Sequence, residues 1–177
     1  MISALGASAS PISNQISLWW IVMGLLLILF ATGFKQAFAE KGRIANTGSW
    51  LIAFYGIGEG IGSGTFKVGN LANSLTISAI IHDILSGMGV VAFLIFPLIM
   101  LKIIPRKEMP VFYRISQFVF ISGMIFIILL QFRYATNGTN FLSLYKGLWQ
   151  RLFMLNTYFY LMCISVLMIT KQKILQP

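Results

Sequence analysis

The sequence predicts an all-α fold, a polytopic bundle of transmembrane helices that crosses the bilayer five times. Hydrophobic residues make up 58% of the 177 residues and charged residues only 10%, whereas a soluble domain carries about 25% charged residues. A water-soluble fold of this length could not hide so much apolar surface. Five stretches also approach the roughly 20 apolar residues that a helix needs to span a membrane. We therefore expect a single transmembrane helical domain over residues 1–177.

The first predicted span covers about 17–38 and follows an uncharged segment, 1–16, which we expect to be an outer tail. The second span, about 48–65, is the weakest, because GIGEGIGSG places a glycine at every second position around Glu59. These glycines predict close helix packing, since small residues let two backbones approach. The alternative is a broken helix around Glu59, whose freed backbone groups would line a cavity.

The other three predicted spans are long and evenly apolar, at about 76–101, 112–132 and 149–170. Barrel strands alternate between apolar and polar residues, and these runs do not. Helices are expected instead, because they satisfy their own backbone hydrogen bonds in hydrocarbon.

The basic residues predict the orientation of the spans, because cytoplasmic loops carry an excess of Lys and Arg. One side of the predicted bundle holds Lys35, Lys41, Arg43, Lys102, Arg106, Lys107, Arg114, Lys171 and Lys173; the other holds Lys67, Arg133, Lys146 and Arg151. We expect the N-terminus outside, the C-terminus in the cytoplasm, and a location in the cell (plasma or inner) membrane. Tryptophans typical of membrane interfaces lie near the span ends, at Trp19, Trp20, Trp50 and Trp149.

The net charge of +9 does not indicate a nucleic-acid partner, because the basic residues are spread through short loops. The single cysteine, Cys163, excludes an internal disulfide and a cysteine-based metal site. A lone histidine cannot build a zinc site, which usually needs three protein ligands. We expect neither a metal nor a cofactor.

Polar and charged side chains converge on the outer half of the predicted bundle. An ionisable group at membrane depth is costly and normally faces the protein interior. The predicted pocket residues are Glu59, Lys67, Ser78, His82, Ser86, Gln131, Arg133, Gln150 and Arg151, with Asp83 beside His82. Ser78, His82 and Ser86 follow one another at intervals of four and so share one face of a helix.

Three functions follow from this pocket as alternatives. The first is binding or transport, in which the mixed charges hold a small polar molecule or a lipid headgroup. The second is an enzyme acting on a lipid or an isoprenoid-linked substrate, with His82 as acid/base beside Asp83 or Glu59, because histidine suits proton transfer near neutral pH. The third is a structural subunit, in an oligomer or with a partner, whose polar groups fix helix packing. Membrane lipids are the expected surroundings in all three.

The chain resembles the bacterial and archaeal membrane proteins of the domain of unknown function 998 family. The matching stretches are ISALGASASP with WWIVMGLLLILFATGF, HDILSGMGVVAFLIFPLIML, and GLWQRLFMLNTYFYLMCISVLMI. The resemblance implies six spans, the first of which is absent here, so that ISALGA corresponds to the loop after it. Family members tend to have a Phe-Pro-x-Asp-like segment after the next span, where this chain reads Gly64-Thr65-Phe66-Lys67-Val68. The resemblance supports the topology and the location of the site only.

Overall fold

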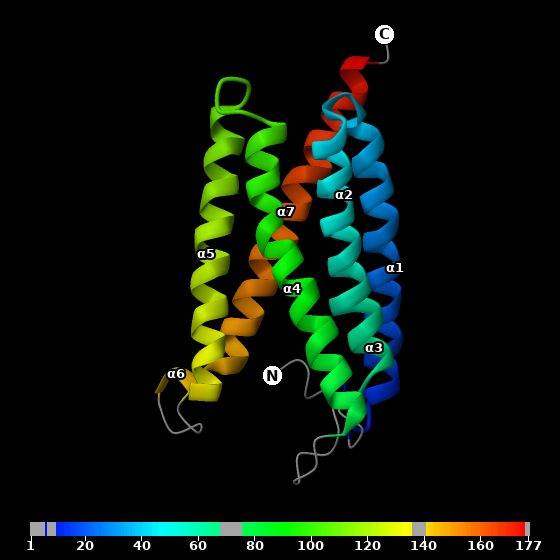
Figure 1. Ribbon diagram of the computed structural model, residues 1–177, viewed down its shortest axis with the longest axis vertical. Coiled ribbons are helices and arrows are strands. Elements are labelled where there is room, and N and C mark those ends of the chain that lie inside the picture. The colour runs from blue at the N-terminus through cyan, green and yellow to red at the C-terminus, as the bar shows by residue number, and fades with distance from the viewer. Residues whose placement is uncertain (1–5, 7–9, 68–75, 136–140, 176–177) are drawn as a thin grey trace.

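The computed structural model describes residues 6, 10–67, 76–135 and 141–175, and all regular elements in these ranges are helical (Figure 1). The elements are α1 (Ser13–Ala37), a short helix η2 (Ala39–Lys41), α2 (Arg43–Tyr55), a π-helix η3 (Gly56–Gly62), α3 (Ser63–Thr65), α4 (Ile77–Ile103), α5 (Pro110–Ala135), α6 (Phe141–Leu144) and α7 (Lys146–Leu175). Four of these, α1, α4, α5 and α7, are long and apolar enough to cross a membrane. The all-α prediction is confirmed for the described residues.

The second predicted span corresponds to α2, η3 and α3, which follow one another without a break. Gly56 and Ser63, the residues at the two junctions, both have right-handed helical backbone angles. The rod therefore runs from Arg43 to Thr65 alongside α1 (Figure 1). Its middle is widened to a π-helix over Gly56–Gly62. The helix is thus widened rather than broken around Glu59.

α1, the rod, α5 and α7 begin before the predicted spans, and α4, α5 and α7 end after them. α1 begins at Ser13, so residues 13–16 of the predicted outer tail are helical, while residues 1–5 and 7–9 of that tail lie outside the described residues. Pro110 occupies the first position of α5, where its missing N–H costs nothing. A hydrophobic stretch in the sequence marks only the part of a helix that suits hydrocarbon, and the polar turns at the helix ends extend beyond it.

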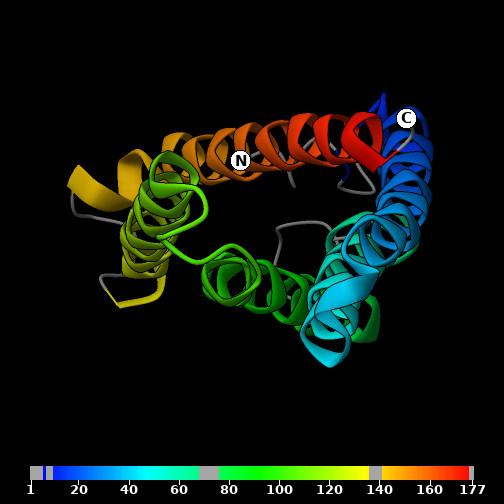
Figure 2. The same ribbon diagram turned by 90° about the horizontal axis from the view of Figure 1, so that it is seen from above.

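The long helices form two groups that meet in a ring. Seen from above, α7 runs along one side and α4 along the opposite side, with α1 and α2 at one end and α5 at the other (Figure 2). α1, α2, η3 and α4 pack against one another, as do α5 and α7, and α4 also contacts α5. Contact between α1 and α7 is sparse. The groups share a core that includes Phe34, Phe96 and Tyr160.

Hydrogen bonds between side chains hold α5 against α7. The Ser116 and Tyr160 hydroxyl groups lie 2.7 Å apart, and the Ser122 hydroxyl donates to Asn156 Oδ1 over 3.0 Å. Asn156 Nδ2 in turn donates to the Val119 carbonyl. In lipid the hydrophobic effect does not drive helices together, so hydrogen bonds between helices are a common means of joining them.

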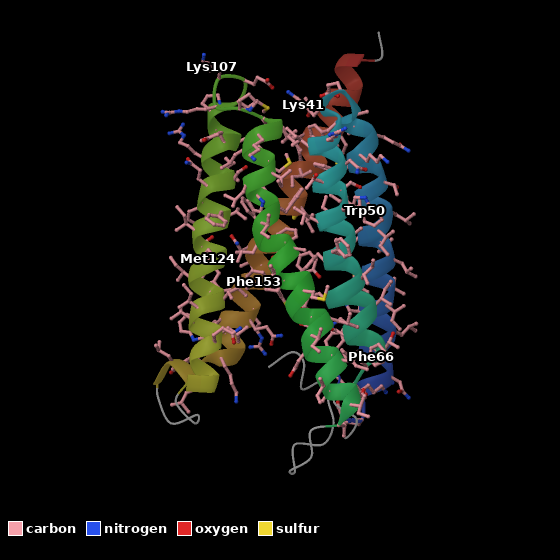
Figure 3. All side chains as sticks on the ribbon, in the orientation of Figure 1. Lys41, Trp50, Phe66, Lys107, Met124 and Phe153 are labelled. Atoms are coloured by element: carbon pink, nitrogen blue, oxygen red, sulfur yellow. The ribbon has the colours of Figure 1, made fainter. Side chains whose placement is uncertain are left out.

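Ion pairs gather at the end of the bundle that was predicted to be cytoplasmic. Lys41 and Lys107 lie at this end, opposite to Phe66 (Figure 3). Lys41 pairs with Glu108 over 3.4 Å, and Lys171 pairs with Glu40. The hydrogen bond from Lys171 lowers the pKa of the Glu40 carboxyl. η2 is thereby tied both to the end of α7 and to the segment between α4 and α5.

Large apolar side chains cover the outside of the bundle along its length. Leu29, Phe118 and Met162 are each more than 60% exposed, on three different helices. A soluble protein does not leave apolar residues exposed all around its surface. Together with the four long apolar helices, this surface identifies a multi-pass membrane protein.

Candidate functional site

The π-helix η3 lies between α1 and α4 at very short range, because its glycines face both neighbours. Every second residue of η3 is a buried glycine. A Cβ atom added at Gly60 would come within 2.7 Å of the Gly24 backbone nitrogen on α1. One added at Gly58 would collide with the Leu85 carbonyl on α4. Gly56, Gly60 and Gly64 thus face α1, and Gly58 and Gly62 face α4, which confirms the predicted close packing.

Glu59 is the one polar side chain of η3, and it is partly buried inside the bundle. The Ser86 hydroxyl on α4 donates a hydrogen bond of 2.6 Å to Glu59 Oε1. The ion pairs of the described residues involve Glu40 and Glu108, so Glu59 has no cationic partner among them. The Glu59 carboxyl, inside the bundle, is therefore held by a neutral donor.

A small cavity lies against Glu59, with a volume of about 30 Å³. Three elements that are distant in the sequence enclose it, namely α1, the α2–η3 junction and α7. Its lining residues are Trp20, Met23, Leu27, Tyr55, Glu59, Gly60, Met154 and Tyr158. The cavity thus lies where the two helix groups meet, along the sparse contact between α1 and α7.

A buried hydroxyl group without a partner lies next to the cavity wall. Thr157 precedes the lining residue Tyr158 and is completely buried, and its Oγ1 has no hydrogen-bond partner among the described residues. The buried hydroxyl of Tyr55 lies close to Thr157 but outside hydrogen-bond geometry. A buried polar group in this state calls for an explanation, such as an unseen water or ligand.

Ser78, His82 and Ser86 share one face of α4, as their spacing predicts, and all three bond to the segment 59–67, which covers the end of the rod and the two residues after it. Ser86 bonds to Glu59, while the Ser78 hydroxyl donates to the Lys67 carbonyl over 3.0 Å. His82 is 5% exposed, and its Nδ1 lies 2.8 Å from the Phe66 carbonyl oxygen. Because a carbonyl only accepts, Nδ1 must carry the proton. His82 and Ser78 therefore anchor the chain where α3 ends.

Lys67 bonds to α1 rather than to an acidic residue. Its Nζ donates to Asn14 Oδ1 over 2.6 Å. The chain segment after α3 is thus tied to α1 through Lys67 and to α4 through His82 and Ser78. Five predicted pocket residues consequently lie where the segment 59–67 meets α4 and α1, namely Glu59, Lys67, Ser78, His82 and Ser86.

Three of the other predicted residues, Asp83, Gln131 and Arg151, are exposed on the surface of the bundle. Asp83 is exposed, because neighbouring residues on a helix point about 100° apart and His82 faces inward. Gln131 on α5 and Arg151 on α7 are exposed and have no hydrogen bond or ion pair among the described residues, and Gln150 is partly buried. The side chain of Arg133 lies outside the described residues.

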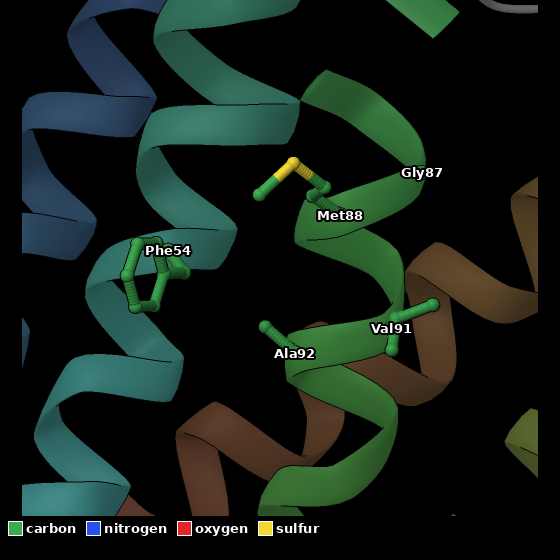
Figure 4. A pocket seen from close by; sticks show the side chains of 5 residues that line it. All are labelled: Phe54, Gly87, Met88, Val91 and Ala92. Atoms are coloured by element: carbon green, nitrogen blue, oxygen red, sulfur yellow. The ribbon is translucent and has the colours of Figure 1, made fainter. Parts of the chain in front are cut away.

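A larger hollow lies between α2 and α4 but offers no polar group. It has a volume of about 460 Å³ and is lined by Phe54, Gly87, Met88, Val91 and Ala92 (Figure 4). Phe54, Met88 and Val91 are among the exposed apolar residues of the surface. This hollow is part of the apolar outside of the bundle, so the chemistry of the site lies in the smaller cavity.

The sequence comparison decides the family of the chain. A family model described as a protein of unknown function, DUF998, matches residues 1–167. The chain belongs to the DUF998 family. Comparison with curated proteins and with solved structures gives no significant match.

In this DUF998 protein, sequence reasoning missed the aromatic walls of the Glu59 cavity. Tyr55 lies four residues before Glu59 and was therefore recognisable as a neighbour on the same helical face. Tyr158 belongs to the polar run Asn156-Thr157-Tyr158 inside an apolar span, which could have marked it. Trp20 was assigned to the membrane interface along with Trp19. Only Trp19 is strongly exposed, at 61%, whereas Trp20 lines the cavity.

Proposed function

We propose that this DUF998 protein binds a small polar molecule at Glu59, in a cavity that opens towards the outer side of the membrane. The single observation that carries the proposal is the position of the Glu59 carboxyl, which lines a cavity between α1, η3 and α7 at membrane depth. An intramembrane ionisable residue marks a functional site by default. The π-helix supports the same conclusion, because π-bulges are frequent at functional sites.

The proposal includes five spans, with the N-terminus outside and the C-terminus in the cell, in the plasma or inner membrane. The uninterrupted rod from Arg43 to Thr65 lies alongside α1 and supplies the fifth span. Lys41 and Lys107 lie at the end opposite to Phe66, and cytoplasmic ends are rich in such residues. This orientation places the Phe66 end of the bundle outside.

The contacts of His82 favour a structural role over catalysis. Its Nδ1–H is used by the Phe66 carbonyl, and its side chain is buried against the end of α3. Its neighbour Asp83 is exposed, so the two do not form an acid/base pair directed at one cavity. Binding at Glu59 is accordingly the function that the geometry supports best.

The accessibility of the cavity from outside tests the proposal. In a Cys163→Ser background, which has no other cysteine, Tyr158→Cys introduces a thiol into the cavity wall. A charged, membrane-impermeant methanethiosulfonate reagent is added to intact cells. We expect Tyr158→Cys to react, because the cavity opens to the outer side in this proposal and the loss of the Tyr158 phenol ring makes room for the reagent beside the new thiol.

Leu155→Cys is the matched control, since Leu155 lies on the same turn of α7 but is 66% exposed on the apolar surface. A charged reagent does not enter hydrocarbon, so this thiol should stay unmodified. Equal, slow reaction of both thiols would overturn the binding site. Reaction of Tyr158→Cys only in inverted vesicles would overturn its outward opening. A C-terminal alkaline phosphatase fusion tests the orientation separately and should be inactive.

A further inference from the structure

We infer that the occupant of the Glu59 cavity is a small monovalent cation, which exchanges with a proton on the Glu59 carboxyl. This inference rests on the proposed binding site and names the class of ligand. Four properties of the cavity lead to it: the charge of Glu59, the chemistry of the walls, the volume, and the titratable groups nearby.

The charge of Glu59 needs a counterpart. A carboxylate in a low-dielectric interior is strongly unfavourable unless it is paired or neutralised. Among the described residues, the hydrogen-bond donor to Glu59 is the neutral Ser86 hydroxyl, which bonds to Oε1. Lys67, the basic residue closest along the chain, bonds to Asn14 instead. The carboxyl is therefore neutral when it carries a proton, and it attracts a cation when it does not.

The walls of the cavity suit a cation better than an anion or a neutral apolar molecule. Trp20, Tyr55 and Tyr158 contribute three aromatic rings. The faces of such rings carry negative electrostatic potential and attract cations, most strongly when water is excluded. None of the lining residues is a Lys or Arg, so an anion would find no compensating charge.

The volume limits the occupant to one small ion. A volume of about 30 Å³ has room for one or two water molecules, since a cavity of roughly 10–15 Å³ already holds one. A lipid headgroup or an amino acid is far larger and does not fit. A dehydrated sodium or potassium ion, or ammonium, is of suitable size. The size thus separates a simple cation from the larger polar ligands that the charges alone would admit.

Among the titratable groups around the cavity, the Glu59 carboxyl is the one placed to exchange a proton for a cation. The second rod contributes Tyr55 and α7 contributes Tyr158, and tyrosine hydroxyls ordinarily titrate near pH 10. On α4, His82 lies one turn from Ser86 and holds the Phe66 carbonyl, and Asp83 is exposed. The α1 residues that line the cavity, Trp20, Met23 and Leu27, do not titrate.

Labelling by dicyclohexylcarbodiimide tests the inference on the full chain in proteoliposomes. This apolar reagent enters membranes and adds to a protonated carboxyl: the proton moves to a carbodiimide nitrogen, the carboxyl oxygen bonds to the central carbon, and rearrangement leaves a stable N-acylurea. Mass spectrometry of peptides measures its formation at Glu59. We expect labelling to slow as the pH rises, and to slow at least tenfold with sodium, potassium or ammonium at constant ionic strength.

The bulky cation N-methylglucamine provides the ionic-strength control and should give no protection, because it exceeds the cavity. Glu59→Gln should remove the label from that peptide. Labelling that responds equally to all four cations, or to none, would overturn the inference. If Tyr158→Cys still reacts from outside in that case, the cavity binds a neutral molecule and the proposed binding site survives. If Tyr158→Cys is also unreactive, the binding site fails as well.

Discussion

Replacing Gly60 by alanine should destabilise the protein far more than the same change at Gly87. Both residues are helical glycines, so helix propensity alone would favour alanine at each by roughly 0.5–1 kcal/mol. They differ in what a methyl group would meet. At Gly60 it lies 2.7 Å from the Gly24 nitrogen and 3.1 Å from the Trp20 carbonyl oxygen, whereas at Gly87 nothing lies within 4 Å.

The size of the effect follows from these distances. Non-bonded carbon atoms pack best at about 3.5–4.0 Å, so α1 must retreat from η3 by roughly 1 Å to admit the methyl group at Gly60. The obstructing atoms are backbone atoms, which cannot rotate away. Overpacking of this kind costs about 1–3 kcal/mol. A loss of about 2 kcal/mol lowers the Tm by roughly 4–8 °C in a chain of this length.

The native Cys163 provides the assay. It is the single cysteine of the chain and is partly buried on α7. A thiol-reactive fluorophore added to the detergent-solubilised protein therefore reports unfolding during heating. We expect Gly60→Ala to unfold several degrees below the wild type, and Gly87→Ala at or slightly above it. A Gly60→Ala variant that melts together with Gly87→Ala would refute the close contact between α1 and η3.

Two further predictions concern hydrogen bonds at opposite ends of the bundle. Because Lys171 lowers the pKa of Glu40 in the folded state, the pair contributes stability above the ordinary carboxyl range and loses it as the pH falls through the lowered value. Because both groups are partly exposed, the pair contributes at most about 1 kcal/mol to the free energy of unfolding. The Tm difference between the wild type and Glu40→Gln should thus shrink on acidification and with added salt. A Tm difference that grows on acidification would contradict the pairing. His82→Ala leaves the Phe66 carbonyl unpaired and should cost about 1–3 kcal/mol. His82→Asn retains an N–H donor and should recover part of that loss in the same thermal assay, and equal stability of the two variants would show that the hydrogen bond is unimportant.

The sequence was sufficient for features that depend on one helix or on a helix pair. The spacing of Ser78, His82 and Ser86 predicted a common face, and all three bond to the segment 59–67. The glycines around Glu59 predicted close packing, which the backbone contacts with α1 and α4 confirm. Five of the predicted pocket residues consequently lie where the second rod meets its neighbours.

Features that depend on which helices are neighbours could not be predicted in this way. Depth in the membrane follows from sequence position, but position around the bundle does not. Gln131 and Arg151 were grouped with Glu59 because they lie at the same end, yet they are exposed on α5 and α7. The cavity wall formed by Met154 and Tyr158 exists only because α7 crosses the bundle towards α1 (Figure 1). No periodicity within a single span contains that information.

The same glycines that permit close packing also determine where Glu59 can point. In Gly56–Gly62, glycine occupies both faces of η3 that meet other backbones, so only Ile57, Glu59 and Ile61 carry side chains. Ile57 is exposed on the apolar surface, whereas Glu59 faces Ser86 and the cavity. A π-helix has more residues per turn than an α-helix, which shifts the side chains that follow around the axis.

Close packing and the position of the carboxyl are therefore two consequences of one segment, so a substitution that separates η3 from α1 should also displace Glu59 from its cavity. Gly60→Ala tests this link directly: it should change carbodiimide labelling at Glu59 as well as the Tm, whereas Gly87→Ala should change neither the labelling nor its response to cations.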